Sequence, residues 1–319
     1  MTDLPTRVEI QEEGPREGFQ IEPGPIATAD KIRFIEALAE TGLPKVQCVS
    51  FVNPRRVPGM ADAEEVANSI RRKAGVQYTG LWLNLKGLER AQATPLDLKG
   101  RILMSASETF SIRNSNRNTA ETIDEQRRWL AAYREAGIAV EWGSVMTAFG
   151  CNFEGAVSPS RVVEIVATIM DLADEAGVTL NGVSFADTVG WATPIAVERV
   201  IGAVRERWPD LEIALHLHDT RGAGLANAYA GLRLGVARFD SSCAGLGGCP
   251  FAGHKGAAGN ICTEDLVFLC EEMGIETGVD LDALIDCARM AEEIVGHPLP
   301  GKVMRGGSLS AIRARTANS

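Results

Sequence analysis

Two of the four histidines in this sequence, His216 and His218, lie two residues apart at the end of a short apolar segment. Side chains alternate between the two faces of a β-strand, so a strand here would direct both imidazoles to one face. Two adjacent imidazoles can bind a divalent metal ion. Asp219 follows them and could orient these ligands by hydrogen bonding from outside the coordination shell. The alternative is a pair of hydrogen-bonded interior histidines, but the position at a strand end favours metal binding.

A glycine-rich segment runs from residue 244 to residue 260 and contains six glycines. Glycine restricts the backbone least, so such a loop can close over a ligand and open again. The segment lacks the Gly-Lys-Ser/Thr ending of a phosphate-binding P-loop. Cys249 lies in its middle, where an accessible thiol could act as a nucleophile or a proton donor. The alternative is a flexible surface loop with an incidental cysteine.

Arg16 and Glu17 follow the first β-type segment and are flanked by Gly14-Pro15 and Gly18. A carboxylate in this position can bind a metal ion, and a neighbouring guanidinium can stabilise a developing oxyanion. A surface turn with a solvated ion pair is the alternative, and the spacing alone favours it slightly.

These residues need a scaffold that brings strand ends together. Eight short β-type segments alternate with longer amphipathic ones, which indicates parallel βαβ units. A doubly wound sheet is the rival architecture, but its GxGxxG pattern is absent after the first segment. We therefore predict an α/β fold, a (β/α)₈ TIM barrel, whose active sites lie at the carboxyl ends of the strands. The predicted strands are Arg7–Gln11, Val46–Val52, Tyr78–Leu83, Arg101–Ala106, Ala139–Thr147, Thr179–Phe185, Glu212–His216 and Arg238–Ser241.

Helix start and stop signals separate these strands, with a hydroxyl or carboxylate at the start and glycine or proline at the end. We expect one catalytic domain over residues 1–300, with an additional C-terminal helical segment outside the barrel, and a mobile tail over residues 301–319 that is rich in Gly, Ser and Arg. The predicted helices are Thr28–Glu40 with Thr28 as N-cap, Asp62–Lys73, Ser158–Ala176, Thr193–Trp208 and Asp280–Val295.

The composition excludes several classes of protein. Among 319 residues, 42 are acidic and 32 are Lys or Arg, which gives a net charge of −10. Such a protein is a poor candidate for nucleic-acid binding, because neutralising phosphates requires a basic surface. No secretory signal pattern is present, and no apolar segment reaches the ~18 residues of a membrane span. Seven cysteines without a CxxC pair indicate reduced thiols and a cytoplasmic location.

Several motifs, taken together and in order, resemble the hydroxymethylglutaryl-CoA lyases, which belong to a wider group of metal-dependent barrel lyases and synthases that includes isopropylmalate synthase. The resemblance extends from about Arg7 to about Gly278, and the long cysteine-containing glycine loop is specific to the lyase branch. The motifs are Val8–Glu22, Ser50–Pro54, Asn84–Gly87, Asp187–Gly190, His216–Thr220 and Gly245–Asn260.

The resemblance implies a TIM barrel that binds one Mg²⁺ or Mn²⁺. Its ligands correspond to Glu17, His216, His218 and the amide of Asn260. The implied partner is a small-molecule acyl-CoA substrate, with no nucleic acid and no membrane, and a homodimer is expected from the resemblance alone.

The catalytic residues implied by the resemblance are three. Arg16 corresponds to the arginine that stabilises the enolate of the departing acetyl-CoA, and Cys249 to the cysteine that transfers a proton to that carbanion. Asp187 is the candidate proton relay at the substrate hydroxyl. The candidate substrate-binding residues are Gln20, Gln47, Ser50, Asn84 and Lys86.

Two positions depart from the family pattern. Glu17 stands where Asp is usual, and Gln47 stands where Glu is usual. The first change moves a carboxylate by about one C–C bond, and the second removes a negative charge near the metal. Both suggest a substrate other than hydroxymethylglutaryl-CoA, still a 3-hydroxyacyl-CoA or a related hydroxy acid.

Three functions are compatible with these motifs. The first is a lyase that cleaves a 3-hydroxyacyl-CoA. The second is a synthase that condenses acetyl-CoA with a keto acid, but Cys249 in its glycine loop favours the lyase. The third is a catalytically altered binding protein, for which Glu17 and Gln47 are the only support.

Overall fold

The computed structural model describes residues 4–248 and 259–317. Contacts between residues divide the chain into two compact units. We call them the central unit, which contains Leu98–Asp240, and the terminal unit, which contains Thr6–Asp97, Ser241–Gly247 and residues 259–317.

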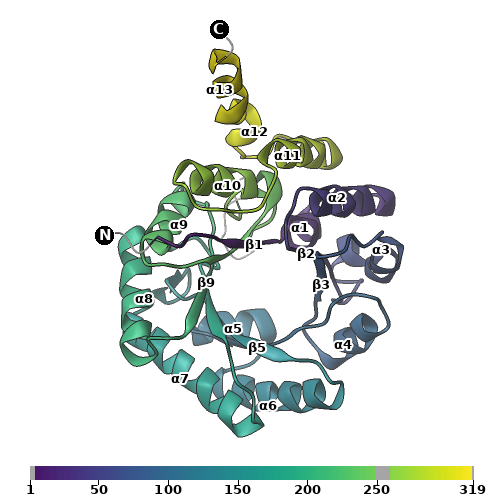
Figure 1. Cartoon of the computed structure of the whole chain (residues 1–319). Coiled ribbons are helices and arrows are strands. Elements are labelled where there is room, and N and C mark those ends of the chain that lie inside the picture. Colours follow the sequence, from purple (N-terminus) through teal and green to yellow (C-terminus); the bar gives the residue numbers. More distant parts are fainter. Residues whose placement is uncertain (1–3, 249–258, 318–319) are drawn as a thin grey trace. The chain divides into compact units, whose positions relative to one another are not determined.

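The terminal unit begins with three parallel strands in the order β3-β2-β1, drawn in the purple and blue part of Figure 1. Helices α2 and α3 pack against each other and against β2. The strands are β1 (Glu9–Glu12), β2 (Lys45–Ser50) and β3 (Gln77–Leu81), and the main helices are α2 (Thr28–Glu40), α3 (Ala63–Ser69), α4 (Leu85–Gln92), α10 (Thr263–Glu272) and α11 (Leu281–Val295).

The central unit has parallel strands in the order β10-β9-β8-β5-β4. Consecutive helices from α6 to α9 pack side by side along these strands, as the teal ribbons of Figure 1 show. Its elements are β4 (Gly100–Ser105), α5 (Glu108–Ser115), α6 (Thr119–Glu135), β5 (Val140–Met146), the small hairpin β6–β7 (Gly150–Cys151 and Gly155–Ala156), α7 (Pro159–Ala176), β8 (Gly182–Ala186), α8 (Pro194–Arg207), β9 (Glu212–His216), α9 (Gly224–Arg233) and β10 (Arg238–Ser241, whose last residue belongs to the terminal unit).

All eight predicted strands are present, and they alternate with helices in the pattern of a (β/α)₈ fold. Each observed strand lies within two residues of its predicted start, apart from β8, which begins three residues late at Gly182. The prediction of the fold class is confirmed.

Some of the predicted helix ends are confirmed by the structure and others are wrong. Ser158 and Thr193 cap α7 and α8 through their side chains, and Gly177 ends α7 with φ 68°. Thr28 is not an N-cap, because its hydroxyl donates to Asp62 at 2.8 Å and Ala27 takes the cap position. Helix α3 was predicted to reach Lys73 but ends at Ser69.

The segment predicted to be a mobile tail carries two short helices, α12 (Val303–Gly306) and α13 (Leu309–Ala317). The carboxylate of Asp265 accepts the backbone N–H groups of Lys302 and Val303 at 3.1 and 2.7 Å and so fixes the start of α12. Helix α11 lies where the additional C-terminal helix was predicted, with Asp280 as its N-cap. Within the described ranges, the helices are too short or too polar to cross a membrane.

Substitutions at two glycines of the central unit, one closely packed and one in open space, test the packing of this unit. A Cβ at Gly182 in β8 would meet the carbonyl oxygen of Glu212 at 2.4 Å and the ring of Trp142 at 2.6 Å, whereas a Cβ at Gly202 in α8 would meet nothing within 4 Å. We expect Gly182→Ala to lower the free energy of unfolding by about 1–3 kcal/mol through overpacking. Gly202→Ala should raise it by about 0.5–1 kcal/mol through helix propensity. Urea unfolding of both variants measures these changes, and equal effects would contradict the close packing around Gly182.

Candidate functional site

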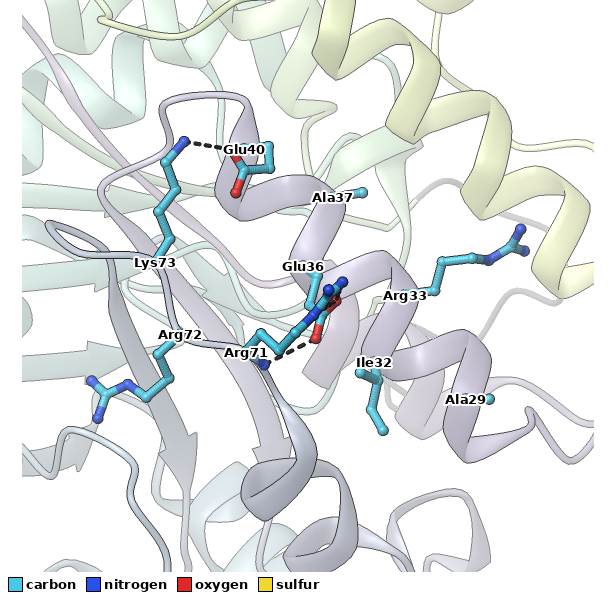
Figure 2. A pocket seen from close by; sticks show the side chains of 9 residues that line it. All are labelled: Ala29, Ile32, Arg33, Glu36, Ala37, Glu40, Arg71, Arg72 and Lys73. Atoms are coloured by element: carbon cyan, nitrogen blue, oxygen red, sulfur yellow. Dashed lines mark hydrogen bonds and ion pairs between the residues drawn. The ribbon is translucent and has the colours of Figure 1, made fainter.

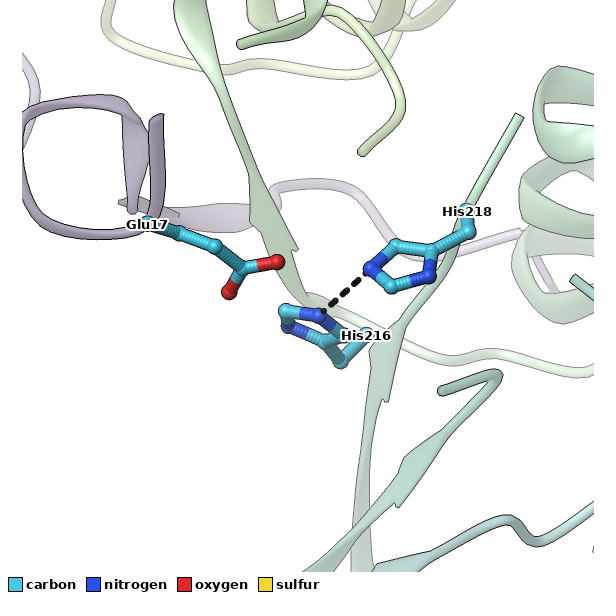
Figure 3. A group of neighbouring side chains, drawn as sticks. All are labelled: Glu17, His216 and His218. Carbon is cyan, nitrogen blue, oxygen red and sulfur yellow. Dashed lines mark hydrogen bonds between the residues drawn. The ribbon is translucent and has the colours of Figure 1, made fainter. Parts of the chain in front are cut away.

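The two histidines at the end of β9 form a close pair, shown in Figure 3. Their Nε2 atoms are 3.3 Å apart and their rings meet edge to face, with centroids at 5.2 Å. His218 is buried and His216 is nearly so. Ligands on adjacent corners of an octahedral ion lie roughly 3 Å apart when each bond is about 2.1 Å. The spacing of the two nitrogens therefore suits a divalent cation.

Asp240 at the end of β10 orients the histidine pair from behind. Its Oδ2 lies 3.3 Å from Nδ1 of His216, which directs Nε2 of that ring toward His218. Such an outer carboxylate fixes the tautomer of a metal-binding histidine. Asp219, the outer residue suggested by the sequence, instead accepts the backbone N–H of Gly224 at 2.8 Å and stabilises the start of α9. The outer position therefore belongs to Asp240 from the neighbouring strand.

Asp187 follows β8 and is buried in a tight turn. Its Oδ1 accepts the backbone N–H groups of Trp191 and Ala192 at 2.6 and 2.9 Å. Its Oδ2 has no hydrogen-bond partner among the described residues. Burial raises the pKa of Asp187, and the nearby histidines together with these two N–H groups oppose that shift. The unsatisfied, desolvated oxygen is suited to exchange a proton with a bound hydroxyl.

In the terminal unit, Arg16 and Glu17 lie in a π-helical turn, Gly14–Gly18, directly after β1. π-Helical turns are rare and occur most often at functional sites. Both side chains are mostly buried, with 12% and 13% of their surfaces exposed, and Nη1 of Arg16 lies 3.1 Å from Oε2 of Glu17. The prediction of a solvated ion pair in a surface turn, which the spacing alone favoured, is therefore wrong. Figure 3 draws the Glu17 side chain as it extends from this turn.

Asn260 is fully buried and oriented by two acceptors. Its Nδ2 donates to Oε1 of Glu17 at 3.0 Å and to the carbonyl oxygen of Leu246 at 3.2 Å. Its Oδ1 is thereby turned away, and no described residue donates to it. Gly247, with φ 94°, allows this packing, since a Cβ there would lie 2.7 Å from Nδ2 of Asn260. An oriented amide oxygen without a donor is suited to a hard cation.

The predicted substrate-binding residues belong to the same unit, where they lie within β2 or after β1 and β3. Gln47 lies at a bulge in β2 and accepts a hydrogen bond from Nε of Arg16. The buried oxygens Oε1 of Gln20 and Oγ of Ser50 have no partner among the described residues. Asn84 caps α4 by accepting the N–H of Gly87 at 2.8 Å, and Lys86 is exposed in the first turn of that helix.

The site residues are divided between the two units. The central unit holds Asp187, His216 and His218. Cys249 lies outside the described residues. The terminal unit holds Arg16, Glu17, Asn260, Gln20, Gln47, Ser50, Asn84 and Lys86.

Two buried carboxylates that the sequence did not single out fix both ends of the glycine-rich segment. Glu12 accepts the N–H of Cys243 at 2.8 Å and the hydroxyl of Thr263 at 2.6 Å. Glu264 accepts the N–H of Ala244 at 2.9 Å. Burial raises the pKa of Glu12 to about 7 and that of Glu264 to about 8, against these hydrogen bonds. The position of an acidic residue at the end of the predicted first strand was the available signal for Glu12.

A groove along the outer surface of α2 is a separate feature, drawn in Figure 2. None of the predicted site residues lines it. Its cations already contact carboxylates, Arg71 with Glu36 at 2.5 Å and Lys73 with Glu40 at 2.8 Å. The groove therefore offers little uncompensated charge to an anionic ligand.

Comparisons with known proteins show which proteins the chain is similar to. The HMGL-like family model matches residues 7–291. The Bacillus subtilis hydroxymethylglutaryl-CoA lyase YngG is 39% identical over 298 residues, which cover 93% of this chain and 96% of that protein. The solved structure of the Pseudomonas aeruginosa hydroxymethylglutaryl-CoA lyase has a TM-score of 0.86 at 38% identity and covers 98% of this chain and 99% of its own. An HMG-CoA lyase from Acinetobacter baumannii, solved in complex with coenzyme A and 3-methylmalate, has a TM-score of 0.84 at 37% identity and covers 97% of this chain and 96% of its own.

The buried carboxyl of Glu264 makes a prediction about pH. Its pKa is about 8 in the folded protein and near 4.5 when unfolded, so between these values the folded state keeps a proton that the unfolded state loses. This contribution to stability is present at low pH and is lost as the pH rises toward 8, by up to about 1.4 kcal/mol per pH unit. We expect the stability advantage of the wild type over Glu264→Gln to shrink from pH 5 to pH 8. Urea unfolding across this range measures it, and parallel pH profiles for the two proteins would contradict a raised pKa.

Proposed function

Since the chain belongs to the HMGL-like family, we propose that it is a divalent-metal-dependent carbon–carbon lyase. Its substrate is a 3-hydroxyacyl-CoA, hydroxymethylglutaryl-CoA or a related compound, which it cleaves to acetyl-CoA and a keto acid. Two relatives named hydroxymethylglutaryl-CoA lyase cover 93% and 95% of this chain, and a similar HMG-CoA lyase was solved with coenzyme A. They favour the lyase over the synthase and over the altered binding protein.

One observation carries the metal-dependent part of the proposal: the Nε2 atoms of His216 and His218 lie 3.3 Å apart while Asp240 holds the other face of His216. The donors Glu17, His216, His218 and Asn260 would hold Mg²⁺ or Mn²⁺. Two imidazoles, a carboxylate and an amide oxygen form a donor set that suits these ions. The undonated Oδ1 of Asn260 supports this assignment, because a buried amide oxygen is costly to leave without a partner.

When bound, the ion would polarise the hydroxyl and a carboxylate of the substrate. Asp187 would accept the hydroxyl proton on its undonated Oδ2. The electrons of that O–H bond form the new carbonyl, and those of the breaking C–C bond pass to the thioester and give an enolate. Arg16 would place fixed positive charge at the enolate oxygen, and the thiol of Cys249 would protonate the carbon to give acetyl-CoA.

The acyl group of the substrate is the finer part of the proposal. Glu17 and Gln47 differ from the usual Asp and Glu of the family that the sequence resembles, so we propose a 3-hydroxyacyl-CoA whose acyl part differs from hydroxymethylglutaryl. Both residues lie against Arg16, the residue assigned to the thioester end of the substrate. Gln20 and Ser50 would contribute the polar oxygens of the pocket.

Further expectations concern the protein as a whole. We propose a single catalytic domain over residues 1–300 and a homodimer in solution. A cytoplasmic location is supported by a relative from Bacillus subtilis and by the absence of disulfides among the six cysteines of the described ranges. Several other relatives are mitochondrial proteins of animals.

The first test is a turnover assay over a panel of 3-hydroxyacyl-CoAs with added Mg²⁺ or Mn²⁺, in which acetyl-CoA formation is measured. We expect one member of the panel to be cleaved and the activity to be lost after chelation and restored by the metal. Undiminished turnover after chelation would contradict the metal requirement. Efficient cleavage of hydroxymethylglutaryl-CoA with the rest of the panel inert would contradict an altered substrate but leave the lyase intact.

A second test separates metal binding from proton transfer. His216→Ala should weaken Mn²⁺ binding more than about 100-fold, and Asp240→Asn by about 10–100-fold through the lost orientation of the ring. Cys249→Ser should bind Mn²⁺ like the wild type but lose most of its turnover. Calorimetry measures the affinities, and a fully active Cys249→Ser protein would show that this thiol is not the proton donor.

A further inference from the structure

The guanidinium of Arg16 is surrounded by acceptors from three positions of the terminal unit. Its Nη2 forms an ion pair with Oε2 of Glu13, its Nε donates to Oε1 of Gln47, and its Nη1 lies 3.1 Å from Oε2 of Glu17. The planar fork of an arginine is fixed most firmly when several of its N–H groups are held by separate acceptors. The Arg16 side chain is thus held in one orientation by its own surroundings.

Glu13 is itself firmly held. It is 2% exposed, and its Oε1 accepts the side-chain amide of Gln11. Its backbone N–H donates to the carbonyl oxygen of Ser241 at 2.8 Å, and its carbonyl oxygen accepts the N–H groups of Arg16 and Glu17 at 3.1 and 2.8 Å. Glu13 therefore fixes Arg16 twice, through the backbone of the π-helical turn and through the carboxylate.

The charges around Arg16 explain why the amide at position 47 is tolerated. With Glu13 and Glu17 as carboxylates and Gln47 neutral, the guanidinium meets two negative charges. A glutamate at position 47 would add a third negative charge at hydrogen-bond distance from the same guanidinium. Like charges held close in a desolvated site repel strongly. An acidic residue at 13 and an amide at 47 form one consistent arrangement.

We propose that Glu13 is a positioning residue for Arg16 and that it carries, from β1, the negative charge that Gln47 on β2 does not. This inference rests on the role of Arg16 in the proposed function. Glu13 would set where the positive charge of the guanidinium stands when the enolate forms, without itself contacting the substrate. Its effect should therefore be seen in kcat, since the charge acts on the transition state.

A charge exchange between positions 13 and 47 tests the proposal. Glu13→Gln should lower kcat by about 100-fold, the cost of misplacing a reacting group by about 1 Å, with KM and Mn²⁺ affinity within about threefold of wild type. Gln47→Glu alone should also lower kcat. The double variant Glu13→Gln/Gln47→Glu should recover at least tenfold over Glu13→Gln. Glu9→Gln, an exposed position on the same strand, is the matched control.

A second measurement, hydrogen exchange of the Arg16 side chain, requires no turnover and therefore does not depend on the identity of the substrate. The ¹⁵N–¹H signal of the Arg16 Nε group, assigned by its loss in Arg16→Lys, should be protected from exchange in the wild type, exposed in Glu13→Gln and protected again in the double variant. Wild-type kcat and a protected signal in Glu13→Gln would overturn the proposal, as would a double variant no better than the single ones. If Glu13→Gln does not fold, Glu13→Asp, which shortens the reach by one methylene, takes its place. If the wild type has no lyase activity, the proposed function is refuted. The exchange of the Arg16 Nε–H group would still show whether Glu13 positions Arg16.

Discussion

The hydrogen bonds of the Glu12 carboxylate are the interactions on which the arrangement of the terminal unit around Arg16 and Glu17 depends. One oxygen accepts the N–H groups of Gly14 and Cys243, and the other accepts the hydroxyl of Thr263. The π-helical turn that carries Arg16 and Glu17 begins at one of these contacts, and the segments that enter and leave the glycine-rich region meet the others. Residues more than 230 positions apart in sequence are thereby tied to the end of one strand.

The cost of burying that carboxyl has a direct consequence for the site. Burial, with a smaller contribution from the neighbouring charge of Glu13, raises its pKa to about 7, although three hydrogen bonds to the carboxylate lower it. Each buried acid near Arg16 therefore makes the next one harder to ionise. The terminal unit accommodates several acids there because most of their oxygens accept hydrogen bonds from backbone, hydroxyl or guanidinium groups. Within this arrangement, an amide at position 47 relieves repulsion.

Much of the fold could be predicted from the sequence, because strand alternation and helix caps are local patterns. His216 and His218 were found for the same reason, since the period of a strand alone places them together. Asp240 and Glu13 could not be found this way. Their partners lie on a neighbouring strand or depend on a π-helical turn, and neither the pairing of strands nor that turn is written in a local pattern. Thr28 failed as a cap because a distant carboxylate, Asp62, captured its hydroxyl.

Glu17 shows how a longer side chain fits where the family resemblance leads one to expect Asp. Its two oxygens have different tasks within the terminal unit: Oε2 faces Arg16 at 3.1 Å and Oε1 accepts the amide of Asn260 at 3.0 Å. The extra methylene packs where Gly247 leaves room, since a Cβ at that glycine would lie 3.0 Å from Cγ of Glu17. The carboxylate is thus fixed between the guanidinium and the amide, and a substitution at position 247 would disturb Glu17 and Asn260 at once. A glutamate at position 17 is therefore accommodated by the residues that surround it.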